Sequence, residues 1–192
     1  MYELIKTNIS KHIAVLDSEW DYFFSLVKEE TIHKKEFIVK EGEVCHLHGF
    51  ILNGLLRTYF IDEKGNEVNL VFHFEDWWFG DIGSYVRNEP SKLNTQAMES
   101  TKVLLIYRED LEKLFEKIPK FERFFRILNQ RTFATLMERY IDDQTKSASE
   151  RYKQLISKRP EILHRMPQHH IASYLGITKE FLSKIRSQKY IY

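Results

Sequence analysis

The sequence predicts an α+β protein in which an antiparallel β-sandwich or barrel is followed by one long helix and a small helical domain. Short apolar runs separated by glycine turns over residues 30–107 predict the β structure. Residues 119–143, which contain no glycine and no second proline, predict the long helix, and residues 166–188 read as two short helices joined by a turn. We therefore expect domains at 1–118, 119–143 and 144–192.

The composition is that of a folded chain with a real core. Its 192 residues are 43% hydrophobic and include 14 Phe, 10 Tyr and 3 Trp, which argues against disorder. The single cysteine, Cys45, excludes an intrachain disulfide and a four-thiolate iron–sulfur cluster held by one chain. The first residues form no apolar leader and no apolar run reaches membrane-spanning length, so we expect a cytoplasmic protein.

The charge is divided unevenly along the chain. Residues 143–192 hold ten Lys or Arg and four Asp or Glu, a net charge of +6. Because the whole chain carries +1, residues 1–142 carry −5. An acidic body with a basic end is the asymmetry expected when one end meets nucleic acid.

Residues 2–28 are predicted to be helical and to pack as a lid on the β region. Ser18 and Asp21 resemble a capping box at a helix start. Apolar side chains then recur on roughly one face of this helix: Trp20, Phe23, Phe24 and Val27.

The β region is punctuated by turn signals of known geometry. Asn53-Gly54 and Lys64-Gly65-Asn66 are both predicted to be hairpin tips. Further turns are expected at Gly42, at 79–81 and at 88–90.

The long helix carries more apolar surface than one domain needs. A stripe close to the coiled-coil period is formed by Phe121, Phe125, Leu128, Thr132 and Leu136. A second surface is formed by Phe124, Phe133, Met137, Tyr140 and Ile141. We interpret the first stripe as a homodimer interface; the alternative is that both surfaces pack within one chain.

A polar hinge at 142–147 precedes the C-terminal domain. Ser147 or Ser149 can cap a helix over 150–158, which Arg159-Pro160 ends. Pro167 suits the first position of the next helix, so three helices are expected in this domain.

Residues 166–188 meet several requirements of a helix-turn-helix at once. Ala172 is small where the two helices approach, and Gly176 allows the left-handed residue that ends the first helix. Ile177 then fills the core and Thr178 can cap the second helix. The apolar positions that face inward are Ile171, Leu175, Ile177, Leu182 and Ile185. The second helix could enter a DNA major groove; the alternative is an αα-hairpin with a solvated polar face.

This order of parts resembles the Crp/Fnr family of bacterial transcription regulators over essentially the whole chain. The resemblance is carried by the Gly42 and Gly54 turns, residues 62–66 and 79–83, and residues 171–186. It implies a cyclic-nucleotide-binding-like β-roll or jelly roll, a long dimerisation helix and a helix-turn-helix domain. It also implies a homodimer on a two-fold-related site in double-stranded DNA, with RNA polymerase as a further partner.

The resemblance implies specific DNA contacts. The matching recognition-helix positions are Thr178, Lys179, Glu180, Ser183 and Lys184. Lysine can donate to guanine or to phosphate, and glutamate can accept from cytosine. Gln168 and His169, at the start of the first helix, are candidates for phosphate contacts. The β-hairpin wing that often follows the recognition helix is not expected here.

The loop that holds a cyclic nucleotide in the family departs from the family pattern. The candidate pocket residues are Gly80, Asp81, Ile82, Gly83, Ser91 and Lys92. The family's nucleotide-binding members carry a glutamate in the turn and an arginine later in the loop, whereas residues 90–95 contain no arginine. A buried phosphate needs a charge-assisted partner. We therefore expect no cyclic nucleotide, and a β-roll that has another ligand or none; the effector is unknown.

Two other function classes have partial support in the sequence. Cys45-His46-Leu47-His48 could place two imidazoles on one strand face as metal ligands, but the glycine and glutamate spacing of cupin enzymes is missing. We therefore expect no metal and, without any nucleophile–base constellation, no enzymatic activity. The alternative function is a ligand- or metal-binding β-barrel module whose helical tail only dimerises and binds no DNA.

Overall fold

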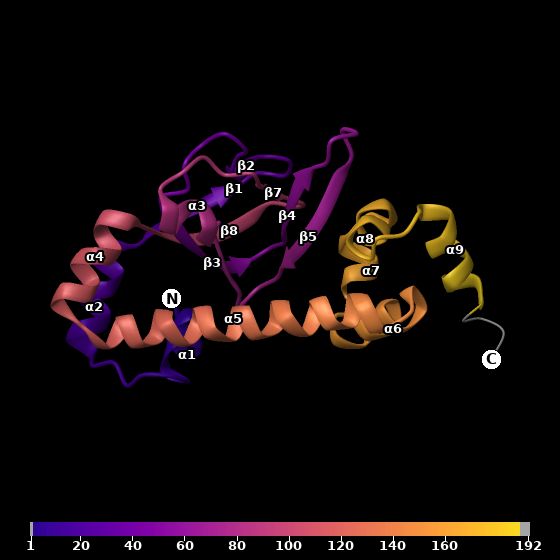
Figure 1. Cartoon of the computed structure of the whole chain (residues 1–192). Coiled ribbons are helices and arrows are strands. Elements are labelled where there is room, and N and C mark those ends of the chain that lie inside the picture. Colours follow the sequence, from indigo (N-terminus) through magenta and orange to yellow (C-terminus); the bar gives the residue numbers. More distant parts are fainter. Residues whose placement is uncertain (1, 189–192) are drawn as a thin grey trace. The chain divides into compact units, whose positions relative to one another are not determined.

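The computed structural model describes residues 2–188, and they form two compact units. The β-roll unit comprises residues 2–58 and 72–133, and the helix-turn-helix unit comprises residues 59–71 and 134–188. Residues 59–71, the tip of the β4–β5 hairpin, therefore belong to the unit that holds the C-terminal helices, whereas the base of the hairpin lies in the β-roll unit. The strands and helices are labelled in Figure 1.

The described part of the chain contains eight strands, and their bounds are β1 Lys28–Ile32, β2 Phe37–Val39, β3 Leu47–Asn53, β4 Leu56–Ile61, β5 Glu67–His73, β6 Trp78–Phe79, β7 Asn94–Ala97 and β8 Thr101–Tyr107. They form two four-stranded sheets, β1-β8-β3-β6 and β2-β7-β4-β5. The pairing of β8 with β1 and β3 is antiparallel. Buried side chains from both sheets, such as Ile51, Leu56 and Leu105, meet in one core. The predicted antiparallel β-roll is thus confirmed.

Nine helices accompany these strands within residues 2–188, and their bounds are α1 Glu3–Ser10, α2 Asp17–Leu26, α3 Ile82–Arg87, α4 Arg108–Lys117, α5 Lys120–Thr145, α6 Ala148–Lys158, α7 Ile162–Arg165, α8 Gln168–Tyr174 and α9 Lys179–Gln188. Figure 1 shows α2 and α4 beside the N-terminal part of α5. No helix within this described stretch is long and apolar enough to cross a membrane.

The N-terminal segment forms two helices that cover the β-roll unit. Trp20 and Phe23 are buried, and the Phe23 ring stacks on Phe121 with 5.3 Å between the ring centroids. The predicted Ser18–Asp21 capping box is wrong. The N-cap of α2 is Leu16, two residues earlier, and the backbone N–H of Leu16 donates to Glu19 Oε2 over 2.7 Å.

The Asn53-Gly54 turn is not a hairpin tip, because it leads from one sheet to the other. Strand β3 lies in the first sheet and β4 in the second. Gly54 has φ +111°, and a Cβ there would lie 2.6 Å from Thr101 Cα, so only glycine fits this crossing. By contrast, Lys64-Gly65-Asn66 is a hairpin tip as predicted, closed by Asp62 N–H donating to Asn66 O.

The long helix exists as predicted, but the stripe assigned to dimerisation is wrong at its N-terminal end. Phe121 is fully buried and Phe125 is 5% exposed, both within the chain's own core. Leu128 packs partly against that core, whereas Thr132 and Leu136 are exposed. Periodicity could not reveal this, because it cannot show that α2 and α4 cover the first two turns.

The C-terminal domain contains four helices instead of the predicted three. The additional one, α7, is a single turn at 162–165. Ser147 caps α6 as predicted, accepting from Glu150 N–H while Glu150 Oε2 accepts from Ser147 N–H. Pro167 lies one residue before α8, at its N-cap position.

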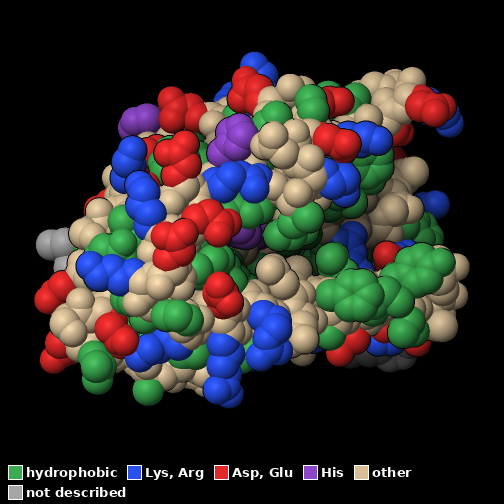
Figure 2. Space-filling model, turned by 60° about the vertical axis from the view of Figure 1, so that its left-hand side comes forward, with side chains coloured by type: hydrophobic (Ala, Val, Ile, Leu, Met, Phe, Trp, Pro, Cys, Tyr) green, Lys and Arg blue, Asp and Glu red, His purple; other side chains and the backbone are tan. Residues whose placement is uncertain are grey.

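Basic and acidic side chains are interspersed on the face presented in Figure 2, with hydrophobic groups among them. That face gives no single-sign field that would mark a polyanion site by itself. The candidate site must therefore be sought in particular side chains.

Candidate functional site

Helices α8 and α9 form the predicted helix-turn-helix. Its core side chains are buried: Ile171, Ala172, Leu175, Leu182 and Ile185. Ile177 is partly buried. Gly176 has φ +66°, and Ile177 N–H donates to Ala172 O over 3.0 Å, which closes the end of α8. Thr178 Oγ1 accepts from Phe181 N–H over 3.2 Å and caps α9.

The predicted recognition residues lie together on the exposed side of α9. Thr178 and the side chains of Lys179, Glu180, Ser183 and Lys184 are all exposed. Hydrogen bonds from its own backbone N–H and from the Thr178 hydroxyl lower the pKa of Glu180. Glu180 is therefore a fixed anionic acceptor between cations, a set of groups that can meet base edges and phosphates.

Gln168 and His169 are exposed in the first turn of α8. The adjacent His170 is buried, with 8% exposure. The His169 and His170 ring centroids are 3.9 Å apart. Only the first two residues are thus available to a partner.

Sequence reasoning missed a contact that holds α8 to the β4–β5 hairpin. Ser173 Oγ donates to Glu67 O over 2.7 Å and accepts from Asn69 N–H over 3.0 Å. Asn69 Nδ2 lies 3.4 Å from His170 Nδ1. These partners are about a hundred residues apart, so no local spacing could have indicated them.

Arg139 of α5 completes this contact. Its guanidinium donates to Leu70 O and, over 3.1 Å, to Tyr174 O. It also lies 4.0 Å from the Tyr174 ring centroid, a cation–π distance. The hairpin, the long helix and α8 are therefore joined by polar bonds within the helix-turn-helix unit.

The glycine-rich loop of the β-roll unit is closed on itself. Asp81 Oδ1 accepts from Ser84 N–H over 3.1 Å and caps α3, and Asp81 Oδ2 accepts from Ser91 Oγ over 2.7 Å. Ser91 Oγ in turn accepts from Leu93 N–H over 2.9 Å. Ser84 Oγ donates to Glu89 O. The structure thus brings Asp81 and Ser91 together, with each bonded to the other.

The remaining predicted pocket residues do not converge on that pair. Lys92 and Gly80 are exposed, and Ile82 is 45% exposed. A Cβ on Gly83 would lie 3.0 Å from the Arg87 guanidinium, and Arg87 Nε bonds Glu89 over 3.1 Å. Residues 90–95 contain no arginine that could face the loop. This donor set does not fit a cyclic phosphate.

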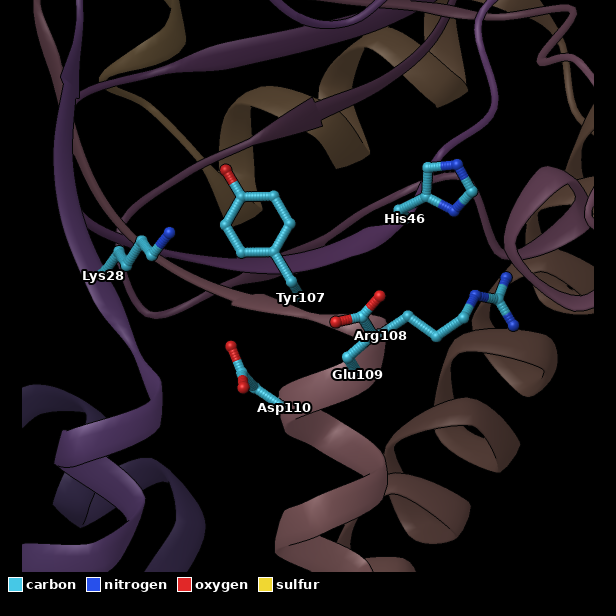
Figure 3. Close-up of a pocket in the computed structure, with 6 residues that line it drawn as sticks. All are labelled: Lys28, His46, Tyr107, Arg108, Glu109 and Asp110. Atoms are coloured by element: carbon cyan, nitrogen blue, oxygen red, sulfur yellow. The ribbon is translucent and has the colours of Figure 1, made fainter.

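A separate surface pocket lies at the start of α4. It is lined by Lys28, His46, Tyr107, Arg108, Glu109 and Asp110. Figure 3 shows the Arg108 side chain extending away from Lys28, and its guanidinium lies 4.0 Å from the Tyr85 ring centroid. Two carboxylates share the pocket with the cations, so it offers no consistent preference for either sign of charge.

The Cys45-His46-Leu47-His48 segment places its two histidines in different surroundings. His46 is exposed, whereas His48 is buried against the Tyr85 and Phe125 rings. Cys45 is buried, with its Sγ 3.5 Å from Leu47 O. Within residues 2–188, no group of three His, Cys, Asp or Glu side chains could hold a metal ion.

Comparison with known proteins agrees with this architecture. The model of the cyclic nucleotide-binding domain matches residues 29–118. The transcriptional activator protein anr of Pseudomonas aeruginosa is 24% identical over 185 residues, covering 90% of this chain and 75% of that protein.

Two solved structures are similar in fold. FixK2 from Bradyrhizobium japonicum is 25% identical with a TM-score of 0.66, covering 84% of this chain and 83% of that one. The Thermus thermophilus catabolite activator protein is 19% identical with a TM-score of 0.58, covering 91% and 84%. Crp/Fnr regulators are non-enzymatic and bind DNA as dimers. The chain thus carries a cyclic nucleotide-binding domain over residues 29–118 and is similar over most of its length to Crp/Fnr transcription regulators.

Proposed function

We propose that this protein binds a two-fold-related DNA site as a homodimer, reads it with α9, and is not controlled by cyclic AMP. The observation that carries the proposal is the capped, exposed first turn of α9, with Lys179, Glu180 and Lys184 facing outward over a buried apolar side. RNA polymerase is the further partner that the family suggests.

The recognition surface is proposed to be Thr178, Lys179, Glu180, Ser183 and Lys184, with Gln168 and His169 on phosphates. The two lysines would donate to guanine O6/N7 or to phosphate oxygens, and Glu180 would accept from cytosine N4. Lysine lacks the planar fork of arginine, so each base contact would be less selective. Duplication by dimerisation compensates for this, because two half-sites must match together.

The exposed apolar side of α5 is our proposed dimer interface. Within α5, large apolar side chains are exposed at Phe133 (66%), Leu136 (49%), Met137 (43%), Tyr140 (61%) and Ile141 (54%). Leu136 and four of the five residues of the second surface thus share this exposure, whereas Phe124 is fully buried. An apolar patch of this kind on a helix marks an interaction site, and a second copy of α5 offers the matching surface.

The effector is proposed not to be a cyclic nucleotide. Asp81 and Ser91 bond each other, and Lys92 is exposed. A cyclic phosphate entering here would break the Ser91–Asp81 bond and meet the Asp81 carboxylate, while the nearby Arg87 guanidinium is paired with Glu89.

DNA binding is tested on duplexes selected from a random-sequence pool by the full-length protein, using fluorescence anisotropy. We expect the association constant to fall on the order of 10³-fold between 50 and 200 mM salt. Lys184→Ala should weaken binding about tenfold or more. Lys34→Ala, which removes an equally exposed lysine from the β1–β2 turn, is the matched control and should change affinity less than about twofold. If no duplex is enriched, or if binding does not depend on salt, the proposal fails.

The dimer is tested by light scattering after size exclusion. The wild type should have twice the chain mass of 23.2 kDa, and Ile141→Glu should yield monomers because it buries a charge at the interface. Val86→Glu changes a side chain that is 70% exposed on α3 and should leave the dimer intact. A dimer that survives Ile141→Glu and Met137→Glu together would refute this interface.

A further inference from the structure

An exposed phenylalanine lies on the proposed recognition helix. Phe181 is 48% exposed. No other large apolar side chain described in α6, α7, α8 or α9 is as exposed. Single exposed apolar residues are ordinary on protein surfaces, so its meaning depends on where on the helix it lies.

Phe181 lies on the flank of α9, between the buried side at Ile185 and the outward face at Lys184. Leu182 is fully buried and Ile185 is 7% exposed, and they define the inward side. At 3.6 residues per turn, Glu180 and Lys184 lie opposite them, and Phe181 lies next to Lys184 at the (i, i+3) spacing. The ring is therefore placed beside the cation that we propose meets the bases.

The position of the ring is fixed by the cap. Phe181 N–H donates to Thr178 Oγ1, so this residue belongs to a formed first turn. Residues in the first turn of a recognition helix are the ones that reach base edges. A polar side chain at this exposed position would be solvated without loss of stability, so the aromatic ring indicates an apolar contact.

We propose that Phe181 reads the C5-methyl group of one thymine in each half-site, an inference that rests on the proposed DNA binding. The thymine methyl is the apolar feature of the major-groove edge, and an apolar side chain is its natural partner. Contact would remove both the methyl and part of the ring from water. Phe181 would then supply base selectivity that the flexible lysines do not.

The experiment replaces each thymine of the selected duplex by uracil, one symmetric pair at a time, because uracil differs only by the missing methyl. For the wild type, we expect one pair to weaken binding about tenfold. Phe181→Ala should bind the thymine duplex about tenfold more weakly and should no longer distinguish uracil at that pair. Phe181→Leu, which keeps an apolar side chain, should retain part of the discrimination.

Lys184→Ala is the control that separates thymine recognition from general weakening. It should lose affinity for both duplexes and keep the thymine-to-uracil ratio at that pair. Far-ultraviolet circular dichroism should show that Phe181→Ala keeps its helices. If the wild type binds DNA but no thymine pair is sensitive, or if Phe181→Ala keeps the full ratio, Phe181 serves a protein partner and the inference falls. If the wild type enriches no duplex at all, it is the proposed function that has failed.

Discussion

The loop at residues 80–93 and the helix α9 use similar residue types in opposite ways. In the loop, the Ser91 hydroxyl donates to the Asp81 carboxylate. The Ser84 hydroxyl accepts from Cys45 N–H and donates to Glu89 O. On α9, the Ser183 and Lys184 side chains are exposed. In the loop the polar groups are hydrogen-bonded to one another, and on α9 they are exposed to solvent.

This difference indicates where binding energy can come from. A polar group that is already bonded inside the fold stabilises the fold, and a ligand can reach it only by breaking that bond. A polar group bonded to water exchanges one partner for another at little cost. By this reasoning, we propose that the loop at residues 80–93 is structural, while α9 is available to a partner.

The largest effect that we expect is the loss of stability of the β-roll unit in acid. Burial lowers the pKa of His48 to about 4, with a smaller contribution from Arg108. Burial also lowers the pKa of His73 to about 4, opposed by the backbone of Trp78. Between the unfolded value of 6.5 and about 4, the unfolded state binds more protons, so stability is full above pH 6.5 and falls as the pH decreases. At pH 5.5 each histidine should cost about 1.4 kcal/mol, or about 2.7 kcal/mol together.

The measurement is urea unfolding at pH 7.5 and 5.5, followed by tryptophan fluorescence. All three tryptophans, Trp20, Trp77 and Trp78, lie in the β-roll unit, so this signal reports that unit. Carboxylates with lowered pKa, such as Glu29, contribute only below their ordinary value of 4.5 and leave this window clear. His48→Phe, which keeps an aromatic ring against Tyr85 and Phe125, should remove about half of the loss. Equal stability at both pH values would show that these histidines are not closed off from water.

The parts that could be predicted from the sequence are those fixed by neighbouring residues. Gly176 ends α8 in the left-handed conformation and Thr178 caps α9, because both requirements are met within a few residues. The glycine-punctuated strands and the long helix without glycine were predictable for the same reason. Features that depend on residues close together in the sequence can be predicted from the sequence.

The sequence-based predictions were wrong where contacts between distant segments of the chain determine the structure. Phe121 and Phe125 have the spacing of a dimer stripe, but both are buried. Phe23 on α2 packs on Phe121, and Phe115 on α4 packs on Phe125. Asn53-Gly54 has the composition of a hairpin, but Thr101 on β8 lies against it and the chain changes sheet there. The Ser173–Asn69 contact joins α8 to a hairpin about a hundred residues away. Periodicity and turn chemistry carry no information about such neighbours.

A smaller effect is expected from the bond that closes the loop. Asp81→Ala removes the α3 cap and the partner of Ser91, and should destabilise the β-roll unit by about 2 kcal/mol. Ser91→Ala should cost about 1–2 kcal/mol, because Ser91 is buried and also accepts from Leu93. The double variant should show a coupling of about 1 kcal/mol, because the two side chains share one charge-assisted bond. Urea unfolding by tryptophan fluorescence measures all four corners of the cycle.

The same cycle can break the contrast between the loop and α9. If the loop is structural, millimolar cyclic AMP should change neither the unfolding midpoint of the wild type nor the coupling between Asp81 and Ser91. If the nucleotide binds, it must displace the Ser91 hydroxyl from Asp81, so the midpoint should rise and the coupling should shrink in its presence. That result would make the loop a ligand site held shut in the free protein, and the internal bonds at Asp81 would then be a competitor of the ligand instead of a replacement for it.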